Sequence, residues 1–385
     1  MREWQRIIDA FDAVVAPDRV AALATVVAVQ GSSYRRPGAR MLITLDGQTW
    51  GGVSGGCLEQ DVIRRARGVI DQNQATLCCY DTSDETEETA TDLSEPIRDP
   101  GPSLGCGGSI EILIEPVSAQ QCVALDRLKR LVRDRQPTDI VTVFRVGGSV
   151  ELTLGAQAHA LAALPKILAL MDETPPTTPA TLTHRLMLGG GWADLLVERL
   201  HPPLSLTLFG DGPDVAPLAE TAKLMGWHVT VVGGYAVARL RSQVPHADRH
   251  ISAPLDNPTG SLALDDAHGA AVVMTHNLNR DSGIIHHLMH SPLAYIGMLG
   301  TRQRSVRVLR SAGVDLASIE PQGRLFAPTG FDLGAPTPEG IAIAVVAEIQ
   351  AMLSGHPGTP LRDRHGPIQP PLPRAIPAAG SSCRL

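Results

Sequence analysis

Apolar residues at the start of the chain follow first a helical period and then a strand period. Residues 2–15 place Trp4, Ile7 and Phe11 on one side of an amphipathic helix. Alternating and β-branched runs bounded by turn residues come next. They predict strands at 23–33, 39–45, 75–81 and 104–116, a hairpin turn at Asp46–Gly47, a β pair at 140–155, and helices over 58–70 and 119–135.

The second half of the chain changes to longer apolar runs separated by helical patterns. Residues 204–235 predict a strand, a glycine turn, a helix and a second strand, and apolar runs at 270–276 and 293–300 predict buried strands. Thr337 and Pro338 suit the first positions of a last helix that runs to residue 353. Strands alternating with helices indicate a doubly wound parallel sheet. The expected fold class is therefore α/β, a small N-terminal α/β domain followed by a Rossmann-like domain.

Chain length and proline content set the expected boundaries. A chain of 385 residues is too long for one ordinary hydrophobic core, so we expect two domains. The N-terminal domain is expected at 1–118 and the C-terminal domain at 204–354. Residues 119–203 form a middle segment whose Pro/Thr-rich part, 171–183, predicts a linker. Residues 355–385 carry seven prolines and little periodicity, which predicts a disordered tail.

Composition and charge exclude several functional classes. The chain is 43% hydrophobic and 19% charged, as is usual for a globular protein. A net charge of −7 and an aromatic content of 3% argue against nucleic-acid binding, which favours a basic face and stacking aromatics. No signal peptide or membrane-spanning run is visible, so we expect a cytoplasmic protein. Its six cysteines are then thiols, and their spacing matches no zinc pattern.

A glycine turn lies between the predicted strand and helix of the C-terminal domain. Gly210 and Gly212 allow a tight turn and a close phosphate, and the helix N-terminus behind them favours an anion. Two positions depart from the dinucleotide pattern. Val215 replaces a third small residue, and Gly233 stands where the next strand supplies a ribose-binding acid. We therefore expect weak NAD or NADP binding or none, and a purely structural turn is the alternative.

Two cysteines lie in glycine-flanked turns of the N-terminal domain. Gly55 and Gly56 precede Cys57, and Gly107 follows Cys106. If Leu58 begins the helix, Cys57 is its N-cap, where the helix dipole lowers the pKa of a thiol. Two soft thiolates suit a soft metal or a sulfur-bearing cofactor. Small residues in tight turns are the alternative, but two such turns in one domain favour function, so we expect both sulfurs to face one cleft.

Further polar residues are candidates for ligand binding. Arg35 and Arg36 precede the predicted hairpin and either hold a phosphate or lie in solvent. His276 and Asn277 follow a buried strand at the sheet edge where α/β proteins bind ligands, and Arg302 follows another strand to the same edge. The alternative for His276 and Asn277 is a turn-capping role.

Two conspicuous polar clusters are expected to be solvent-exposed. His286 and His290 have the spacing of metal ligands, but with His287 they lie opposite the apolar Ile284 and Ile285, which predicts a solvated helix face. The acidic loop at 81–99 carries eight carboxylates without the spacing of a calcium loop.

A series of stretches from about residue 20 to residue 353 carries a family resemblance. They are "GSSYRRPGARMLI", "GGVSGGCLEQDV", "YDTSDE", "GCGGSIEILIEP", "LFGDGPDVAPLAETAKLMGWHVTVV", "VVMTHNLNRD", "AYIGMLGTRQR" and "APTGFDLGAPTPEGIAIAVVAEI". In this set and order the chain resembles the XdhC/CoxI family of maturation factors for molybdenum hydroxylases such as xanthine dehydrogenase. The segment 119–203 and the tail are not covered.

The resemblance implies a function in cofactor delivery. Family members bind molybdenum cofactor, as molybdopterin or its cytosine dinucleotide form, support its sulfuration and deliver it to an apo molybdenum hydroxylase. It implies that Cys57 and Cys106 contact the cofactor at its molybdenum, that a cysteine desulfurase is a candidate partner, and that the protein is a homodimer. The chain departs from the family at Pro213, Gly233 and Pro336, which leaves nucleotide binding in the C-terminal domain in question.

Two classes of function follow. One is a cofactor-insertion chaperone and not an enzyme; the other is an NAD(P)-dependent oxidoreductase that uses the Rossmann-like domain. The paired cysteine turns and the missing ribose acid favour the chaperone.

Overall fold

The chain divides into two compact units in the computed structural model. Residues 3–202 make up most of the N-terminal unit and residues 203–364 most of the C-terminal unit. The structure describes residues 2–15, 20–31, 33–81, 108–118, 122–150, 152–155, 168, 180–253, 262, 264, 266–314, 323–334, 336–365 and 374–375. The segment 119–203 thus contributes its described strands to the N-terminal unit, up to residue 202.

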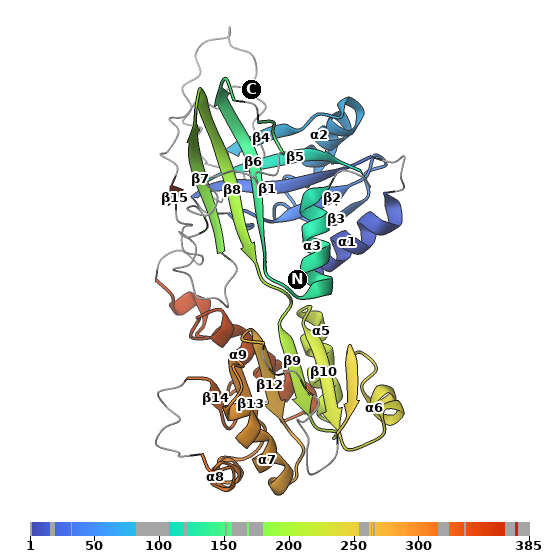
Figure 1. Ribbon diagram of the computed structural model, residues 1–385, viewed down its shortest axis with the longest axis vertical. Coiled ribbons are helices and arrows are strands. Elements are labelled where there is room, and N and C mark those ends of the chain that lie inside the picture. The colour runs from blue at the N-terminus through green and yellow to red at the C-terminus, as the bar shows by residue number, and fades with distance from the viewer. Residues whose placement is uncertain are drawn as a thin grey trace. The chain divides into compact units, whose positions relative to one another are not determined.

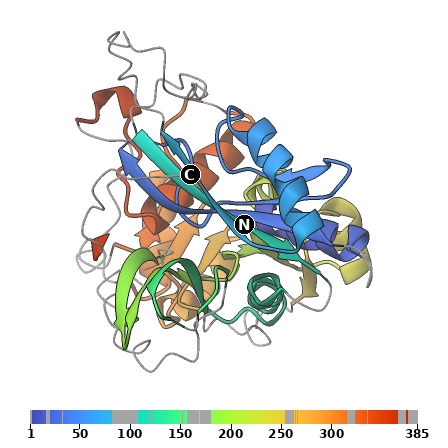
Figure 2. The same ribbon diagram turned by 90° about the horizontal axis from the view of Figure 1, so that it is seen from above.

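The first sheet of the N-terminal unit is antiparallel, with the order β3-β2-β1-β5-β4. Its strands are β1 (Ala21–Gly31), β2 (Arg40–Ile43), β3 (Thr49–Gly51), β4 (Thr76–Asp81) and β5 (Gly108–Val117). Helix α2 (Glu59–Gln72) covers one face, and Figure 2 shows it lying across the strands. The alternation of β1 produces this arrangement, because Ala22, Ala24 and Val26 pack toward α2 while Leu23 and Val27 face the other way.

The second sheet of the N-terminal unit was only partly expected. Its order is β15-β7-β8-β6, with β6 (Thr138–Gly148), β7 (Ala180–Leu188), β8 (Gly191–Leu200) and β15 (Arg374–Ala375). The expected β pair at 140–155 is wrong, because β6 pairs with β8 along its whole length. Residues 180–183 of the expected linker belong to β7, which forms a hairpin with β8 through Gly189–Gly190.

The two sheets pack face to face in the N-terminal unit. Val27 and Leu113 of the first sheet meet Phe144 and Leu196 of the second. An ion pair crosses the same interface, with Arg40 Nη1 3.0 Å from Glu198 Oε1 and both side chains only 1% exposed. Two helices, α1 (Arg2–Val14) and α3 (Val123–Asp134), close one end of this core.

The C-terminal unit has the expected doubly wound parallel sheet (Figure 1). Its order is β11-β10-β9-β12-β13-β14, so the order reverses between β9 and β12. The strands are β9 (Ser205–Phe209), β10 (His228–Gly233), β11 (Arg249–Ser252), β12 (Gly269–Val273), β13 (Tyr295–Met298) and β14 (Leu325–Phe326). Helices α5 (Val215–Leu224) and α9 (Pro338–Leu353) cover one face. Helices α7 (Leu278–Met289) and α8 (Arg302–Ser311) cover the other, and α6 (Val237–Gln243) connects β10 to β11.

The local signals at the end of the C-terminal unit are confirmed. Thr337 caps α9 by accepting the N–H of Gly340, and Pro338 occupies the first turn. Within 355–385 the structure describes a 3₁₀ turn (Leu361–Asp363) and strand β15, which pairs with β7. None of the described helices combines the length and apolar character needed to cross a bilayer.

Candidate functional site

The Cys57 turn connects β3 to α2 and leaves the thiol of Cys57 exposed. Contrary to the expectation from the sequence, Cys57 is not the N-cap. Helix α2 begins at Glu59 with Leu58 at the N-cap. The cause lies upstream, since Ser54 Oγ accepts the N–H groups of Gly56 (3.2 Å) and Leu58 (3.1 Å). The Ser54 hydroxyl therefore accepts the backbone N–H groups that precede the helix, and Cys57 lies in the turn before α2 and not in the helix itself.

A chain of hydrogen bonds leads from the thiol to a carboxylate. Cys57 Sγ donates to Ser54 Oγ (3.5 Å), and the Ser54 hydroxyl donates in turn to Glu59. The Ser54 N–H also donates to Glu59 Oε1 (2.9 Å). Partial burial would raise the pKa of Glu59, but the hydrogen bonds from Ser54 outweigh it and hold that pKa below its usual value. The turn is thus tied to an ionised carboxylate.

Arg35 and Tyr34 border the Cys57 turn. Arg35 Nη1 forms an ion pair with Glu3 at 3.0 Å. A Cβ on Gly52 would lie 3.3 Å from Arg35 Nη2 and 3.7 Å from Glu59 Oε1. The Arg35 guanidinium and the Glu59 carboxylate therefore both lie close to Gly52. Within the described part of the chain, Arg35 Nε is buried and has no hydrogen-bond partner. Tyr34 is 73% exposed, and its ring lies against Gly55.

The remaining N-terminal candidates are placed differently. Arg36 is exposed. Cys106, Gly107 and the acidic loop beyond Asp81 lie outside the described residues, so the pairing of Cys106 with Cys57 stays a prediction. The first described residue after Cys106 is Gly108, which pairs with Gly31 at the end of β1.

The turn after β9 lies at the point where the strand order reverses. A Cβ on Gly210 would lie 2.7 Å from the carbonyl oxygen of Met274, so this glycine lets the chain pass close to β12. Gly212 faces the ring of His276, and His276 Nε2 is 3.7 Å from Asp214 Oδ2. His276 has a φ of +59°, in the left-handed region. The structure thus brings together the two glycines and the histidine that the sequence singled out.

Asn277 caps α7 by accepting the N–H of Arg280 at 3.0 Å. The structure therefore shows the capping role for Asn277. His276 instead contacts Gly212 and Asp214 in the turn after β9.

Comparison with known proteins now identifies the family. Residues 14–81 match the model described as the XdhC and CoxI family, and residues 206–349 match the XdhC Rossmann domain. A probable xanthine dehydrogenase subunit of Bacillus subtilis (strain 168) is 32% identical over 338 residues, covering 88% of this chain and 94% of the relative. The chain belongs to the XdhC/CoxI family.

Other relatives extend the XdhC/CoxI match. The molybdenum cofactor insertion chaperone PaoD of Escherichia coli (strain K12) is 23% identical over 335 residues, covering 86% of this chain and 83% of that protein. A crystal structure described as a xanthine dehydrogenase from Bacillus halodurans superposes with a TM-score of 0.67 at 26% identity, covering 92% of this chain and 96% of that chain. The Rossmann-like α/β fold is therefore shared.

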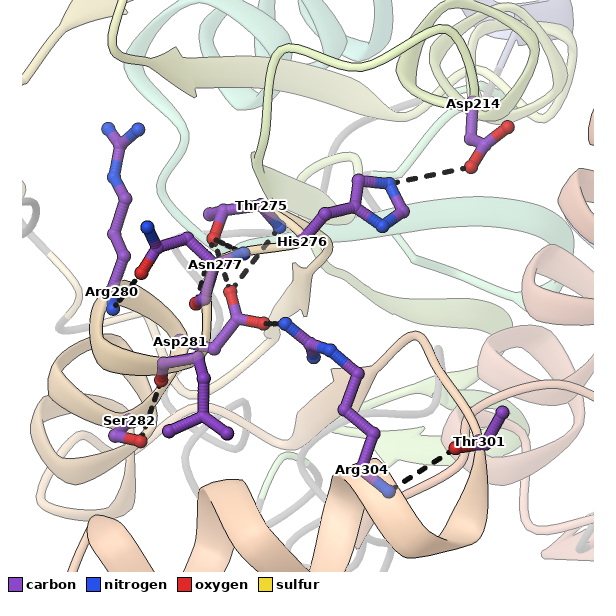
Figure 3. A network of polar contacts seen from close by, with 10 residues as sticks. Asp214, Thr275, His276, Asn277, Arg280, Asp281, Ser282, Thr301 and Arg304 are labelled. Carbon is purple, nitrogen blue, oxygen red and sulfur yellow. Dashed lines mark hydrogen bonds and ion pairs between the residues drawn. The ribbon is translucent and has the colours of Figure 1, made fainter.

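A buried ion pair that the sequence did not reveal supports the His276 turn of this XdhC/CoxI member (Figure 3). Asp281, which is fully buried, accepts from Thr275 Oγ1 (2.5 Å) and pairs with Arg304 Nη2 (2.6 Å). Arg302, the predicted arginine, is exposed at the first position of α8. The sequence carries one signal for Arg304, which is the capping residue Thr301. Thr301 accepts the N–H of Arg304 at the start of α8, so the cap places Arg304 in the first turn of that helix.

The sequence indicates Asp211 only as a negative charge beside the glycine turn and not as a site residue, yet its carboxylate lies at the end of β10. Its Oδ2 accepts the N–H of Gly234 at 2.9 Å. A Cβ on Gly233 would point at the Asp211 side chain, 3.2 Å from its Cβ and 3.4 Å from Oδ2. The glycine pair at 233–234 indeed carries no acid, but a carboxylate from the neighbouring turn occupies that place.

The histidine cluster on α7 has the expected exposure. His286, His287 and His290 are exposed, while Ile284 and Ile285 are buried. Across the described residues, no group of three or more His, Cys, Asp or Glu side chains is arranged to hold a metal ion.

Proposed function

We propose that this chain is an accessory protein that binds molybdenum cofactor, supports its sulfuration and delivers it to an apo molybdenum hydroxylase of the xanthine dehydrogenase type. Membership in the XdhC/CoxI family and the names of the relatives in Bacillus subtilis and Escherichia coli support this function. The observation that carries the proposal is the exposed thiol of Cys57 on a glycine turn beside Arg35.

The residues around Cys57 fit such a cofactor. The thiol is exposed, and a Cβ on Gly56 would meet no atom within 4 Å, so the approach to the sulfur is open. The Arg35 guanidinium is partly exposed beside this turn and is the proposed partner of an anionic oxygen of the cofactor. When bound, the cofactor supplies a molybdenum–dithiolene centre and a phosphate. Either the molybdopterin form or its cytosine dinucleotide form is compatible with these groups.

The chain's own residues then have separate roles. Cys57 provides the soft ligand, and Ser54 and Glu59 hold its turn in place through the hydrogen bonds described above. Tyr34 offers an exposed ring beside the glycines, against which a flat pterin can stack. Cys106 is the proposed second sulfur ligand and Gly107 its flanking glycine; Arg36 is the proposed additional phosphate contact.

The test is to purify the protein from cells with and without molybdenum cofactor synthesis and to measure bound molybdopterin. We expect near-stoichiometric pterin from the first preparation and none from the second. An equal and negligible pterin content in both would contradict the proposal.

The partners belong to the same proposal. The apo hydroxylase is the recipient, a cysteine desulfurase is the proposed sulfur donor, and the assembly is a cytoplasmic homodimer. Co-purification with the apo and holo forms of a hydroxylase tests the first point, because only the apo form requires cofactor. Sedimentation tests the dimer.

One observation favours a second function, an NAD(P)-dependent oxidoreductase. The strand order of the C-terminal unit is that of dinucleotide-binding domains. Hydride transfer from NADH or NADPH to a substrate would support this alternative. Nucleotide binding without any turnover would favour the accessory protein.

A further inference from the structure

We propose that the outer face of α8 binds the acidic stretch 81–99 of a second copy of this chain. This arginine face consists of five residues, Arg302, Gln303, Val306, Arg307 and Arg310. Each copy supplies one arginine face and one acidic stretch, so a pair of chains forms the contact twice. The inference rests on the homodimer of the proposed function and names the contact that holds it together.

The arginine face is one continuous stripe on α8. Its five residues alternate between steps of one and three positions, which keeps them on one side of a helix. The three arginines and Gln303 are exposed, and Val306 is half-buried. Four of the five also line a hollow in the surface, namely Arg302, Gln303, Val306 and Arg307. A segment of another chain can therefore lie along α8 and reach several guanidinium groups at once.

The adjacent helix does not neutralise the arginine face. Helix α8 contains no acid, and the single acid of α7, Asp281, is buried and paired with Arg304 at 2.6 Å. Figure 3 shows the Arg304 side chain reaching Asp281. Over the described ranges, no ion pair involves Arg302, Arg307 or Arg310. Three positive charges are thus left for an acidic partner.

The acidic stretch 81–99 accounts for the whole net charge of the chain. Its eight carboxylates and one arginine give a net charge of −7, which equals that of all 385 residues. Without this stretch, the 40 acidic and 33 basic residues become 32 of each. Blocks of like charge are typical of segments that bind an oppositely charged partner. The acidic stretch is therefore the part of the sequence that best complements the arginine face.

Exchange of the acidic stretch between two copies gives a closed assembly. Asp81, where the stretch begins, pairs with Ser109 of β5 in the N-terminal unit, whereas α8 belongs to the C-terminal unit. Two identical contacts related by a twofold axis satisfy both faces and both stretches, so no third copy can add. A single exposed ion pair contributes little. The second contact forms between chains that are already joined, which strengthens the pair as a whole.

Sedimentation of the full-length protein at low and high salt is the first test. We expect a dimer at about 50 mM NaCl whose dissociation constant rises at least about tenfold at about 500 mM, because salt screens exposed charges. A dimer that is indifferent to salt would overturn the contact, and so would a monomer under both conditions.

Two charge-reversed variants test the contact itself. One carries Arg302→Glu with Arg307→Glu, and the other carries Glu87→Arg with Glu88→Arg. Each alone should be largely monomeric, whereas an equimolar mixture should form a heterodimer, because opposite charges then face each other in both contacts. Arg241→Glu, at an exposed position of α6, is the control and should dimerise like the parent. Absence of the heterodimer from a mixture of two folded variants would overturn the proposal.

A fluorescent peptide of residues 81–99 provides a measurement that needs no variant to fold. Its anisotropy should rise on addition of the full-length protein, and a peptide with amides in place of its carboxylates should not bind. Equal binding of the two peptides would contradict the role of charge. Salt-dependent binding by a chain that stays monomeric would place the contact within one chain and overturn the exchange.

Two parallel measurements separate this inference from the proposed function. A monomeric chain that holds molybdopterin would contradict the exchange alone, whereas a salt-sensitive dimer without pterin would contradict the proposed function alone. Co-purification with an apo hydroxylase tests the other occupant. Its loss on reversal of Arg302 and Arg307, in a variant that still dimerises, would assign the arginine face to the hydroxylase and overturn the exchange.

Discussion

The two glycine turns differ in what their glycines do. In the Cys57 turn, Gly51 and Gly56 have φ values of +86° and +114°, so glycine permits the backbone conformation itself. In the turn after β9, a side chain on Gly210 would collide with the backbone of Met274, directly after β12, so glycine permits a close approach. The first turn is held by its own side chains, the second by neighbouring strands. Glycine therefore permits an exposed turn in one unit and a close approach of the chain to the sheet in the other.

The largest effect should come from removing the thiol. Cys57→Ala should reduce bound molybdopterin by at least about tenfold, because a metal or dithiolene contact is lost while no packing is removed. Cys79→Ala, on β4 of the same unit, is the control and should retain the pterin content of the parent. Equal pterin in Cys57→Ala and parent would remove Cys57 from the site.

The next effect compares an added side chain at a closely packed glycine, Gly210, with one at a glycine that has room for it, Gly55. Gly210→Ala places a Cβ 2.7 Å from the Met274 carbonyl oxygen, and we expect a loss of about 1–3 kcal/mol in unfolding free energy. Gly55→Ala meets the Tyr34 ring at an ordinary 3.5 Å and should change stability by less than about 0.5 kcal/mol. Thermal or urea unfolding measures both. Similar losses would show that the two turns are held alike.

Removal of the Ser54 hydroxyl should have a smaller effect, confined to the N-terminal unit. Ser54→Ala leaves the N–H groups of Gly56 and Leu58 without their acceptor, at a cost of about 1 kcal/mol. Hydrogen exchange should accelerate at the start of α2 and stay unchanged in α5. Faster exchange in both helices would indicate a general loss of stability.

The smallest effect is a pH dependence of the Cys57 turn. The folded-state pKa of Glu59 is below its usual value, so ionisation stabilises the turn above the unfolded-state pKa of about 4.5. This contribution is lost as pH falls through the folded-state pKa. Glu59→Gln should therefore be less stable than the parent at pH 7, and the difference should shrink in acid. A difference independent of pH would assign the effect to hydrogen-bond geometry alone.

Local patterns predicted those elements that depend on near neighbours. The helical period of α1, the Asp46–Gly47 turn and the capping of α9 are all encoded within a few residues, and the structure has them. The β7–β8 hairpin was missed because the Pro/Thr-rich stretch 171–183 runs into β7, and because His184 interrupts its row of apolar positions. Partnership between β6 and β8 depends on residues about fifty positions apart, which no local window contains.

The candidate sites show the same limit. Gly212 and His276 were singled out separately, and their contact follows from the strand order. Asp211 and Arg304 were missed because their roles depend on where other strands end. Asp211, in the turn after β9, reaches the end of β10, and Arg304, on α8, reaches Asp281 on α7. Residue type and spacing indicate a candidate edge of a sheet, but only pairing shows which side chains meet there.

The buried pair of Arg40 and Glu198 has a consequence for the synthesis of the protein. The two residues are 158 positions apart, and neither has access to water in the folded unit. At usual translation speeds Arg40 leaves the ribosome roughly 10–30 s before its partner. During that interval the first sheet has no second sheet to cover its inner face. A nascent chain halted after β5 would therefore expose this face and an unpaired guanidinium until the β7–β8 hairpin has been made.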